Sequence, residues 1–250
     1  MKTSVGNLEQ RRQRVFDQTV ELHIKDLHAF YGESYALHGI DLSVYQGELV
    51  TLLGRNGSGR TTTLRSIVGL ITRRTGSILL KGQEIINSAP HVVANLGVGY
   101  CPEERGIFSS LNVEENLLLP PTVAPGGLPV EELYEMFPNL AERRKSQGTR
   151  LSGGEQQMLA MARILRTGAN VLLLDEITEG LAPVIVDKLG EVLIELKTRG
   201  YTIVLVEQNF RFAAPLADRH FIVDHGRVAA VIHKDALQEE QHVFDEYLSV

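Results

Sequence analysis

The chain has 250 residues, of which 43% are hydrophobic and 22% are charged, a composition typical of a globular protein with a sizeable core. Its net charge of −6 leaves no general basic field, so we expect no nucleic-acid partner. A lone cysteine excludes an internal disulfide and favours a reducing cytoplasm, and no apolar stretch reaches the roughly 18 residues needed to span a bilayer.

The first part of the chain divides into a charged leader and a strand-rich segment. Residues 1–19 lack an apolar signal core and predict a polar N-terminal extension outside the fold, which would occupy residues 20–250. Apolar and polar side chains then alternate, which predicts an antiparallel, half-exposed sheet. Residues 49–53 form a denser apolar run that ends at Gly54.

A glycine-rich loop follows this run and precedes a helical pattern over residues 61–68. It matches the phosphate-loop pattern except that Arg60 stands where the pattern has lysine. The glycines let successive N–H groups point at phosphate oxygens, the following helix adds the positive end of its dipole, and Thr61 is placed to hold Mg²⁺. The predicted nucleotide-binding loop comprises Gly54, Arg55, Asn56, Gly57, Ser58, Gly59, Arg60, Thr61 and Thr62.

The arginine in this loop is not a conservative replacement for lysine. A guanidinium is larger than an ammonium, is planar and prefers side-on bidentate contacts. We therefore expect ATP binding at this site to survive better than the full catalytic rate.

The middle of the chain predicts a helical subdomain over about residues 104–165. Short helical patterns flank a stretch rich in proline and glycine between residues 120 and 129, which predicts a surface loop. One helix is expected to start after Asn112, because Glu115 three residues later completes a capping box.

A second anion-binding pattern lies at the end of this subdomain. A serine and two glycines precede a helical pattern over residues 156–165, which predicts a hydroxyl and free backbone N–H groups at a helix N-terminus. A single nucleotide cannot easily contact both this helix N-terminus and the one that follows the phosphate loop of the same chain. We call these residues the signature segment: Leu151, Ser152, Gly153, Gly154 and Glu155.

The last third of the chain alternates strands with helices. Residues 171–174 predict a buried strand that ends in Asp175, expected to order Mg²⁺, and Glu176, expected to polarise an attacking water. Helices are predicted over residues 183–199 and 210–217, and strands over residues 202–207, 220–223 and 228–232. This order predicts an α/β fold with a mostly parallel sheet covered on both faces.

With the phosphate loop, the signature segment and the acidic strand in this order, the chain resembles the ATP-binding cassette (ABC) family from about residue 20 onward. Residues 100–105, 113–116, 152–158 and 205–209 look most like the ATPase subunits of branched-chain amino acid importers, of the LivF-like type. The resemblance implies a P-loop NTPase core, an N-terminal antiparallel β-subdomain and a helical signature subdomain. It also implies ATP and Mg²⁺ as cofactors.

The resemblance implies roles for further residues. Tyr31 lies where the family has its adenine-stacking aromatic, and residues 179–183 match the loop that couples the two sites of the dimer. Glu103 stands where most cassettes have a glutamine that touches Mg²⁺ and water, and Gln208 replaces the histidine that usually contacts the γ-phosphate. A neutral glutamine supplies neither a proton nor a positive charge, so the chemistry depends more on Glu176.

The partners are also implied by the resemblance. A second ABC ATPase subunit would form a head-to-tail dimer, in which the signature segment reads the γ-phosphate bound by the partner. Two transmembrane permease subunits, docked by residues 104–115, and indirectly a periplasmic solute-binding protein would complete the importer. The chain would then be cytoplasmic and peripheral on the inner face of the cell membrane.

Three functional interpretations follow. The first is the ATP-hydrolysing motor subunit of an importer for branched-chain or other hydrophobic amino acids, with turnover in doubt because of Arg60. The second is a nucleotide-binding partner subunit with a weak site of its own, which completes the active site of the partner cassette. The third, a small-molecule kinase, leaves the signature segment without a role. The solute and the choice between homodimer and heterodimer stay open.

Overall fold

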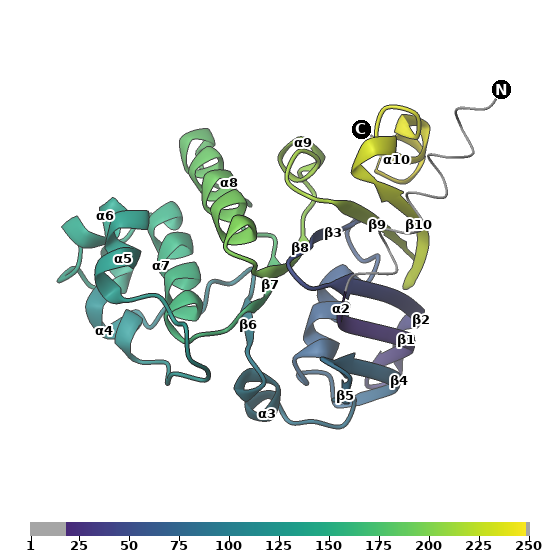
Figure 1. The fold of residues 1–250 in the computed structure, drawn as a ribbon, viewed down its shortest axis with the longest axis horizontal. Helices are drawn as coiled ribbons and strands as arrows, with labels where there is room; N and C mark the ends of the chain where they lie inside the picture. The colour runs from purple at the N-terminus through teal and green to yellow at the C-terminus, as the bar shows by residue number, and fades with distance from the viewer. Residues whose placement is uncertain (1–18, 249–250) are drawn as a thin grey trace.

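The computed structural model describes residues 19–248, so the predicted polar extension lies outside the described residues except for Thr19. The described part contains two β-sheets with helices beside them (Figure 1). None of its helices has both the length and the apolar character needed to cross a membrane.

The first sheet is antiparallel and has the strand order β2-β1-β4-β5. Strands β1 (Val20–Tyr31) and β2 (Ser34–Tyr45) form a hairpin, as the alternating pattern predicts. Strands β4 (Arg73–Leu80) and β5 (Gln83–Glu84) extend the sheet and were not predicted. Buried leucine and isoleucine side chains of β1, β2 and β4 form one core face of this sheet.

The second sheet is mostly parallel, as predicted, with the order β10-β9-β3-β8-β7-β6. Only β10 runs antiparallel to its neighbour in this sheet. The apolar residues 49–53 belong here and are buried at every position, as expected for a strand covered on both faces. The strands are β3 (Leu49–Leu53), β6 (Val98–Cys101), β7 (Val171–Asp175), β8 (Thr202–Val206), β9 (Arg219–Asp224) and β10 (Arg227–His233).

The helices around this sheet differ in part from the predictions. Helix α2 (Arg60–Ile67) begins one residue earlier than the pattern indicated, and α8 (Pro183–Thr198) matches its prediction closely. Helix α9 (Phe210–Ala213) is shorter than predicted, because Pro215 lacks the N–H donor that a longer helix would need. Two helices were not predicted: α3 (Pro90–Asn95) and α10 (Gln241–Leu248).

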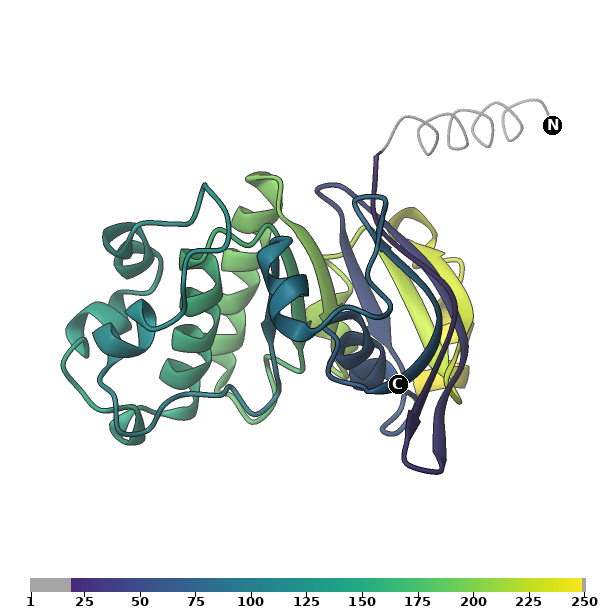
Figure 2. The same cartoon turned by 90° about the horizontal axis from the view of Figure 1, so that it is seen from below.

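Four helices gather at the β6 and β7 side of the sheet (Figures 1 and 2). They are α4 (Val113–Leu118), α5 (Val130–Met136), α6 (Pro138–Glu142) and α7 (Gly153–Arg166). The predicted capping box of α4 is confirmed: the amide of Glu115 donates to Asn112 Oδ1 at 2.8 Å, and the amide of Asn112 donates to Glu115 Oε2 at 2.8 Å. Helix α7 begins at Gly153, so the two glycines of the signature segment lie in its first turn rather than ahead of it.

Candidate nucleotide site

The site lies at one edge of the parallel sheet. Strands β3, β7 and β8 end there at Leu53, Asp175 and Val206, and ligands of parallel α/β sheets bind beyond such carboxyl ends. A pocket of about 310 Å³ opens at this edge. It is lined by Ala36, Asn56, Gly57, Ser58, Gly59, Arg60, Thr61, Thr62, Glu103, Glu176, Glu179 and Gln208.

The phosphate loop has the backbone that its glycines were expected to allow. Gly57 and Gly59 adopt φ angles of 80° and 109°, which residues with a side chain rarely adopt. A Cβ atom at Gly54 would lie 2.2 Å from the carbonyl oxygen of Val223, so no larger residue fits there. The buried Ser58 Oγ has no hydrogen-bond partner among the described residues, and Ser58 is one of the residues that line the pocket.

Three of the predicted nucleotide-binding residues do not line this pocket. Gly54 lies behind it against Val223, and Arg55 lines a separate pocket of about 360 Å³ beside α10. Tyr31 is 46% exposed and places its hydroxyl 3.5 Å from Thr62 Oγ1. Its ring is therefore accessible next to the phosphate loop, where a stacking partner could reach it.

The predicted metal ligands Thr61 and Asp175 are in contact. Thr61 Oγ1 donates to Asp175 Oδ1 at 3.0 Å, and the Tyr100 hydroxyl donates to Asp175 Oδ2 at 3.1 Å. Burial raises the pKa of Asp175, while these two hydrogen bonds oppose the shift. The Thr61 hydroxyl at the start of α2 and the Asp175 carboxylate at the end of β7 are oxygen ligands of the kind that Mg²⁺ prefers, so the residues present fit this cation.

Arg60 is buried at the floor of the pocket, with 4% of its surface exposed. Its Nη1 donates to the carbonyl oxygen of Glu207 at 2.9 Å, and its Nη2 lies 3.1 Å from Glu176 Oε1. Burial lowers the pKa of Arg60, and the charges of Glu176, Asp175 and Glu207 oppose this shift. The guanidinium thus bridges the phosphate loop and the predicted catalytic carboxylate.

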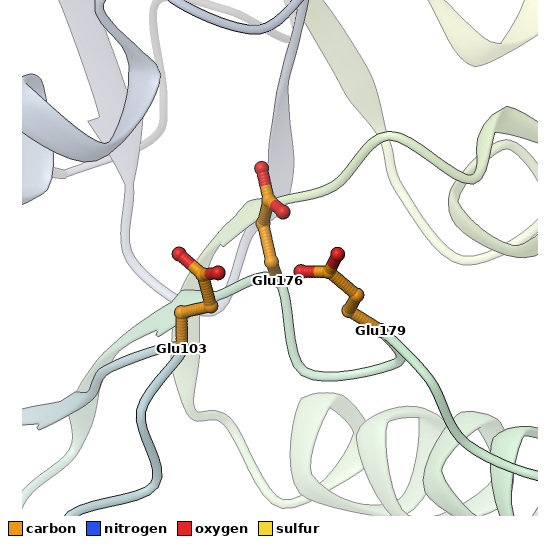
Figure 3. A group of neighbouring side chains, drawn as sticks. All are labelled: Glu103, Glu176 and Glu179. Atoms are coloured by element: carbon orange, nitrogen blue, oxygen red, sulfur yellow. The ribbon is translucent and has the colours of Figure 1, made fainter.

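Glu176 is held at both carboxylate oxygens. Arg60 occupies Oε1, and Gln208 Nε2 donates to Oε2 at 2.7 Å. Its backbone has a φ angle of 48°, an uncommon conformation for a residue with a side chain, and its amide donates to the Val206 carbonyl at 2.9 Å. This turn directs the side chain into the pocket, where Figure 3 shows it between two other acids.

Glu103, Glu176 and Glu179 converge on one another (Figure 3), with a carboxylate oxygen of each within 4.8 Å of the others. Like charges at this separation repel, and the pKa of Glu179 is raised chiefly by the charge of Glu176. The predicted metal ligand Glu103 therefore lies with these acids in the same pocket that Thr61 lines. A cation in the same space, free or bound to phosphate, would reduce the repulsion among these three carboxylates.

The signature segment does not line this pocket. Ser152 Oγ accepts the amide of Glu155 at 3.3 Å, and Glu155 Oε2 accepts the amide of Ser152 at 2.7 Å, so the two form the capping box of α7. Leu151 is buried in the core of the helical group, while Gly153 and Gly154 lie in the first helical turn, whose N–H groups need outside acceptors. The structure therefore brings none of these five residues to the pocket that the phosphate loop lines.

Sequence reasoning missed several residues of this edge. Ala36 and Glu179 line the pocket, Tyr100 holds Asp175, and Glu207 accepts from Arg60. Glu179, three residues after Glu176, was assigned only to the coupling loop. The available signal for Glu207 was an acidic residue directly after an apolar strand pattern. Its partner Thr178, however, lies 29 residues away in the sequence.

Comparisons with known proteins agree with this geometry. The family profile described as ABC transporter matches residues 37–179. The chain is 38% identical to the high-affinity branched-chain amino acid transport ATP-binding protein BraG of Pseudomonas aeruginosa, covering 88% of this chain and 95% of BraG. It is 39% identical to the probable branched-chain amino acid transport ATP-binding protein LivF of Archaeoglobus fulgidus, covering 81% and 88%.

Similarity extends beyond amino acid transport. The chain is 31% identical to the lipopolysaccharide export system ATP-binding protein LptB of Haemophilus influenzae, covering 91% of this chain and 96% of LptB. Among solved structures, a nucleotide-free ATP-binding cassette from an ABC transporter superposes with a TM-score of 0.77 at 23% identity, covering 90% of this chain and 97% of the cassette.

Proposed function

The chain belongs to the ABC transporter family, and we propose that it is the ATP-binding and ATP-hydrolysing subunit of an importer. The observation that carries this proposal is the convergence of the phosphate loop, the Thr61–Asp175 contact and Glu176 at one pocket. These are the groups that a phosphoryl-transfer site needs for positioning and for stabilising negative charge.

ATP would bind with its phosphates on the phosphate loop. The loop amides, the N-terminus of α2 and Arg60 supply the positive field, and the exposed ring of Tyr31 supplies a face for the adenine. Thr61, Asp175 and Glu103 would hold Mg²⁺, which neutralises phosphate charge when bound. Tyr31 does not line the pocket, so the adenine would rest outside it, on the exposed ring beside Thr62.

Glu176 is the group proposed to orient the attacking water. Gln208 holds its carboxylate from one side, and the neighbouring acids Glu103 and Glu179 raise the local negative charge. A carboxylate held in this way at the pocket that the phosphate loop lines is in place to orient a water beside the terminal phosphate.

The signature segment supports a head-to-tail partner cassette. It lies outside the chain's own pocket yet presents the N-terminus of the 14-residue helix α7, which suits a phosphate bound by another subunit. Two permease subunits would dock on residues 104–115, and through them the chain would sit on the inner face of the membrane. A periplasmic solute-binding protein would deliver the solute.

The proposed solute class is branched-chain or other hydrophobic amino acids. Its support is the similarity to the amino acid transport proteins BraG and LivF, which exceeds the similarity to LptB. No residue of the nucleotide pocket distinguishes these solutes, since a cassette acts through the permeases.

One observation favours the second candidate function, a nucleotide-binding subunit with a weak site of its own. Arg60 is paired with Glu176, and this pair must separate or rearrange before the guanidinium can serve a phosphate and the carboxylate a water. The capping box keeps the signature segment intact for the partner in either case.

Calorimetric titration of the purified chain with Mg-ATP tests the binding half of the proposal. We expect Mg-dependent binding that Tyr31→Ala weakens without abolishing, because stacking contributes roughly 1–3 kcal/mol per base. Tyr35→Ala is the matched control: Tyr35 is a comparably exposed aromatic that stacks on Phe30. Absence of Mg-dependent binding by the wild type even at millimolar ATP would show that the loop no longer binds nucleotide.

A further inference from the structure

Glu207 is a buried acid that has no role among the catalytic, nucleotide-binding and metal-binding residues proposed above. It follows β8 directly, is 2% exposed, and its amide donates to the Leu52 carbonyl at 3.4 Å, which extends the pairing of β8 with β3. Burying a carboxylate is costly unless hydrogen bonds compensate, so its partners need an explanation.

A single residue satisfies both oxygens of this carboxylate. The amide of Thr178 donates to Glu207 Oε1 at 3.1 Å, and the hydroxyl of Thr178 donates to Oε2 at 3.0 Å. Thr178 is itself buried and lies two residues after Glu176. The contact therefore fixes the loop that carries the proposed catalytic carboxylate to the end of β8.

Glu207 also lies beside the two groups that touch the Glu176 carboxylate, Arg60 and Gln208. Its carbonyl oxygen accepts from Arg60 Nη1 at 2.9 Å, and the following residue, Gln208, donates to Glu176 Oε2 at 2.7 Å. The side chain of Glu207 therefore holds the loop at Thr178, and its backbone carbonyl accepts from Arg60, which is itself paired with Glu176.

The backbone at Glu176 explains why such an anchor is needed. A φ angle of 48° is unfavourable for a residue with a Cβ atom, and such conformations persist where surrounding contacts enforce them. The Val206 carbonyl holds the amide of Glu176, and Glu207 holds the turn two residues later. Without the second contact, the loop is free to relax and to move the carboxylate.

The electrostatics agree with this role. Burial raises the pKa of Glu207 to about 7, while the hydroxyl and amide of Thr178 and the amide of Asn209 oppose the shift. The same hydrogen bonds that hold the loop therefore also stabilise the ionised carboxylate.

We propose that Glu207 is a positioning residue for ATP hydrolysis, whose carboxylate places Glu176 by clamping Thr178 two residues later. This inference rests on the proposed function, because it assigns a task in the reaction of that same pocket. It concerns the placement of Glu176 and not the binding of the phosphates.

Substitutions separate positioning from stability. Glu207→Ala removes the clamp, and we expect kcat to fall on the order of 10- to 100-fold with the KM for ATP changed less than about threefold, since a misplacement near 1 Å costs about 10²-fold. Glu207→Gln keeps both contacts, because its carbonyl accepts the Thr178 amide and its NH₂ donates to the Thr178 hydroxyl, so kcat should stay within about threefold of wild type.

A double-variant cycle and a control complete the kinetic test. Thr178→Val removes the hydroxyl but keeps the amide, so it should cause a smaller loss that vanishes in the Glu207→Ala background. Glu48→Ala is the control: Glu48 is a buried acid paired with Arg219 at the opposite end of β3. It should lower the melting temperature while leaving kcat unchanged.

Hydrogen exchange of the Thr178 amide, followed by NMR of threonine-labelled full chain, tests the clamp without catalysis. Glu207→Ala should speed exchange at least about tenfold under conditions where global stability is matched to Glu48→Ala, and Glu207→Gln should not. Wild-type exchange in Glu207→Ala, or wild-type kcat in a folded Glu207→Ala chain, would overturn the inference. Absence of hydrolysis by the wild type would count against the proposed function alone, and the exchange result would still decide whether the clamp exists.

Discussion

Arg60 uses two different guanidinium nitrogens to contact the Glu207 carbonyl and the Glu176 carboxylate. A lysine at this position would have to reach both acceptors from one nitrogen at the end of a flexible stem. The planar fork therefore favours a state in which the carboxylate of Glu176 is paired with the phosphate loop. In the proposed function, this pairing would be exchanged, at least in part, for contacts with phosphate.

We expect Arg60→Lys to raise the hydrolysis rate at this chain's own site, because a lysine releases Glu176 more readily and leaves more room for the γ-phosphate. Single-turnover hydrolysis in the reconstituted dimer, with the catalytic acid of the partner mutated, isolates this site. An unchanged or lower rate would mean that the loop has adapted to arginine.

His220 makes a separate prediction about pH. It is fully buried, its Nδ1 lies 2.7 Å from Thr51 Oγ1, and its ring packs edge-on against Phe244 of α10. Burial lowers the pKa of His220 to about 4, and the nearby Lys234 adds to the shift. Because the unfolded chain then binds more protons, the stability due to neutral His220 is complete above about pH 6.5 and is lost as the pH falls toward 4.

Urea denaturation between pH 7 and pH 4.5 measures this contribution, which is at most about 3 kcal/mol. His220→Asn should flatten the decline of the unfolding free energy over this range, since an amide can still bond Thr51 but does not titrate. A parallel decline in the two proteins would assign the acid sensitivity to other groups.

At the scale of elements, the segment before α4 is held in place by the buried side chain of Asn116. Asn116 is buried, and its amide group bonds the backbone of Phe108 at 2.9 and 3.0 Å and the carbonyl of Leu111 at 3.1 Å. The Phe108 ring is nevertheless 49% exposed, with the Arg163 guanidinium 5.6 Å from its centroid. A rigid loop that presents an exposed aromatic suits docking.

Phe108→Asp should therefore lower transporter assembly and solute uptake while leaving ATP affinity intact. Co-purification with the permeases, together with calorimetry on the isolated variant, measures the two effects. Ile194→Asp on α8 is the matched control, because Ile194 is a similarly exposed apolar residue outside this loop. Normal assembly and uptake with Phe108→Asp would indicate an ordinary surface loop.

The elements that the sequence predicts well are those with a continuous apolar signal. Residues 49–53 and 171–174 are buried throughout, and both strands lie where the pattern put them. Strand β4 was missed because its first half is mostly exposed and contains Gly76, so alternation begins only at Ile78. Helix α3 buries only Val93, which leaves no helical stripe to recognise.

The residues of the site likewise fall into two groups: those that the sequence predicts and those that it does not. The glycines, Thr61 and Glu176 could be predicted because their spacing itself carries the chemistry. The clamp between Glu207 and Thr178 and the pairing of Arg60 with Glu176 depend on how distant strands align at the sheet edge. Such contacts cannot be derived from local spacing in one sequence.

For the whole molecule, the proposed head-to-tail dimer would have two composite sites, because the signature segment does not line the pocket of the phosphate loop. In that dimer Arg60 would affect only the site on this chain's loop, whereas Ser152 would serve the nucleotide of the partner. If the partner carries lysine, disabling Ser152 should cost more total activity than disabling Arg60. Steady-state hydrolysis of the reconstituted dimer with Ser152→Arg or Arg60→Ala compares the two, and equal losses would contradict the asymmetry.

In the proposed function, this chain hydrolyses ATP with Glu176 as the group that orients the water. Glu176→Gln tests it most directly in the assembled transporter, because the amide preserves shape and removes the charge. We predict unchanged Mg-ATP binding, a closed dimer that accumulates, and turnover reduced by a factor on the order of 10² to 10⁴. Turnover of Glu176→Gln equal to that of the wild type would contradict the account and favour a nucleotide-binding subunit that only completes the site of its partner.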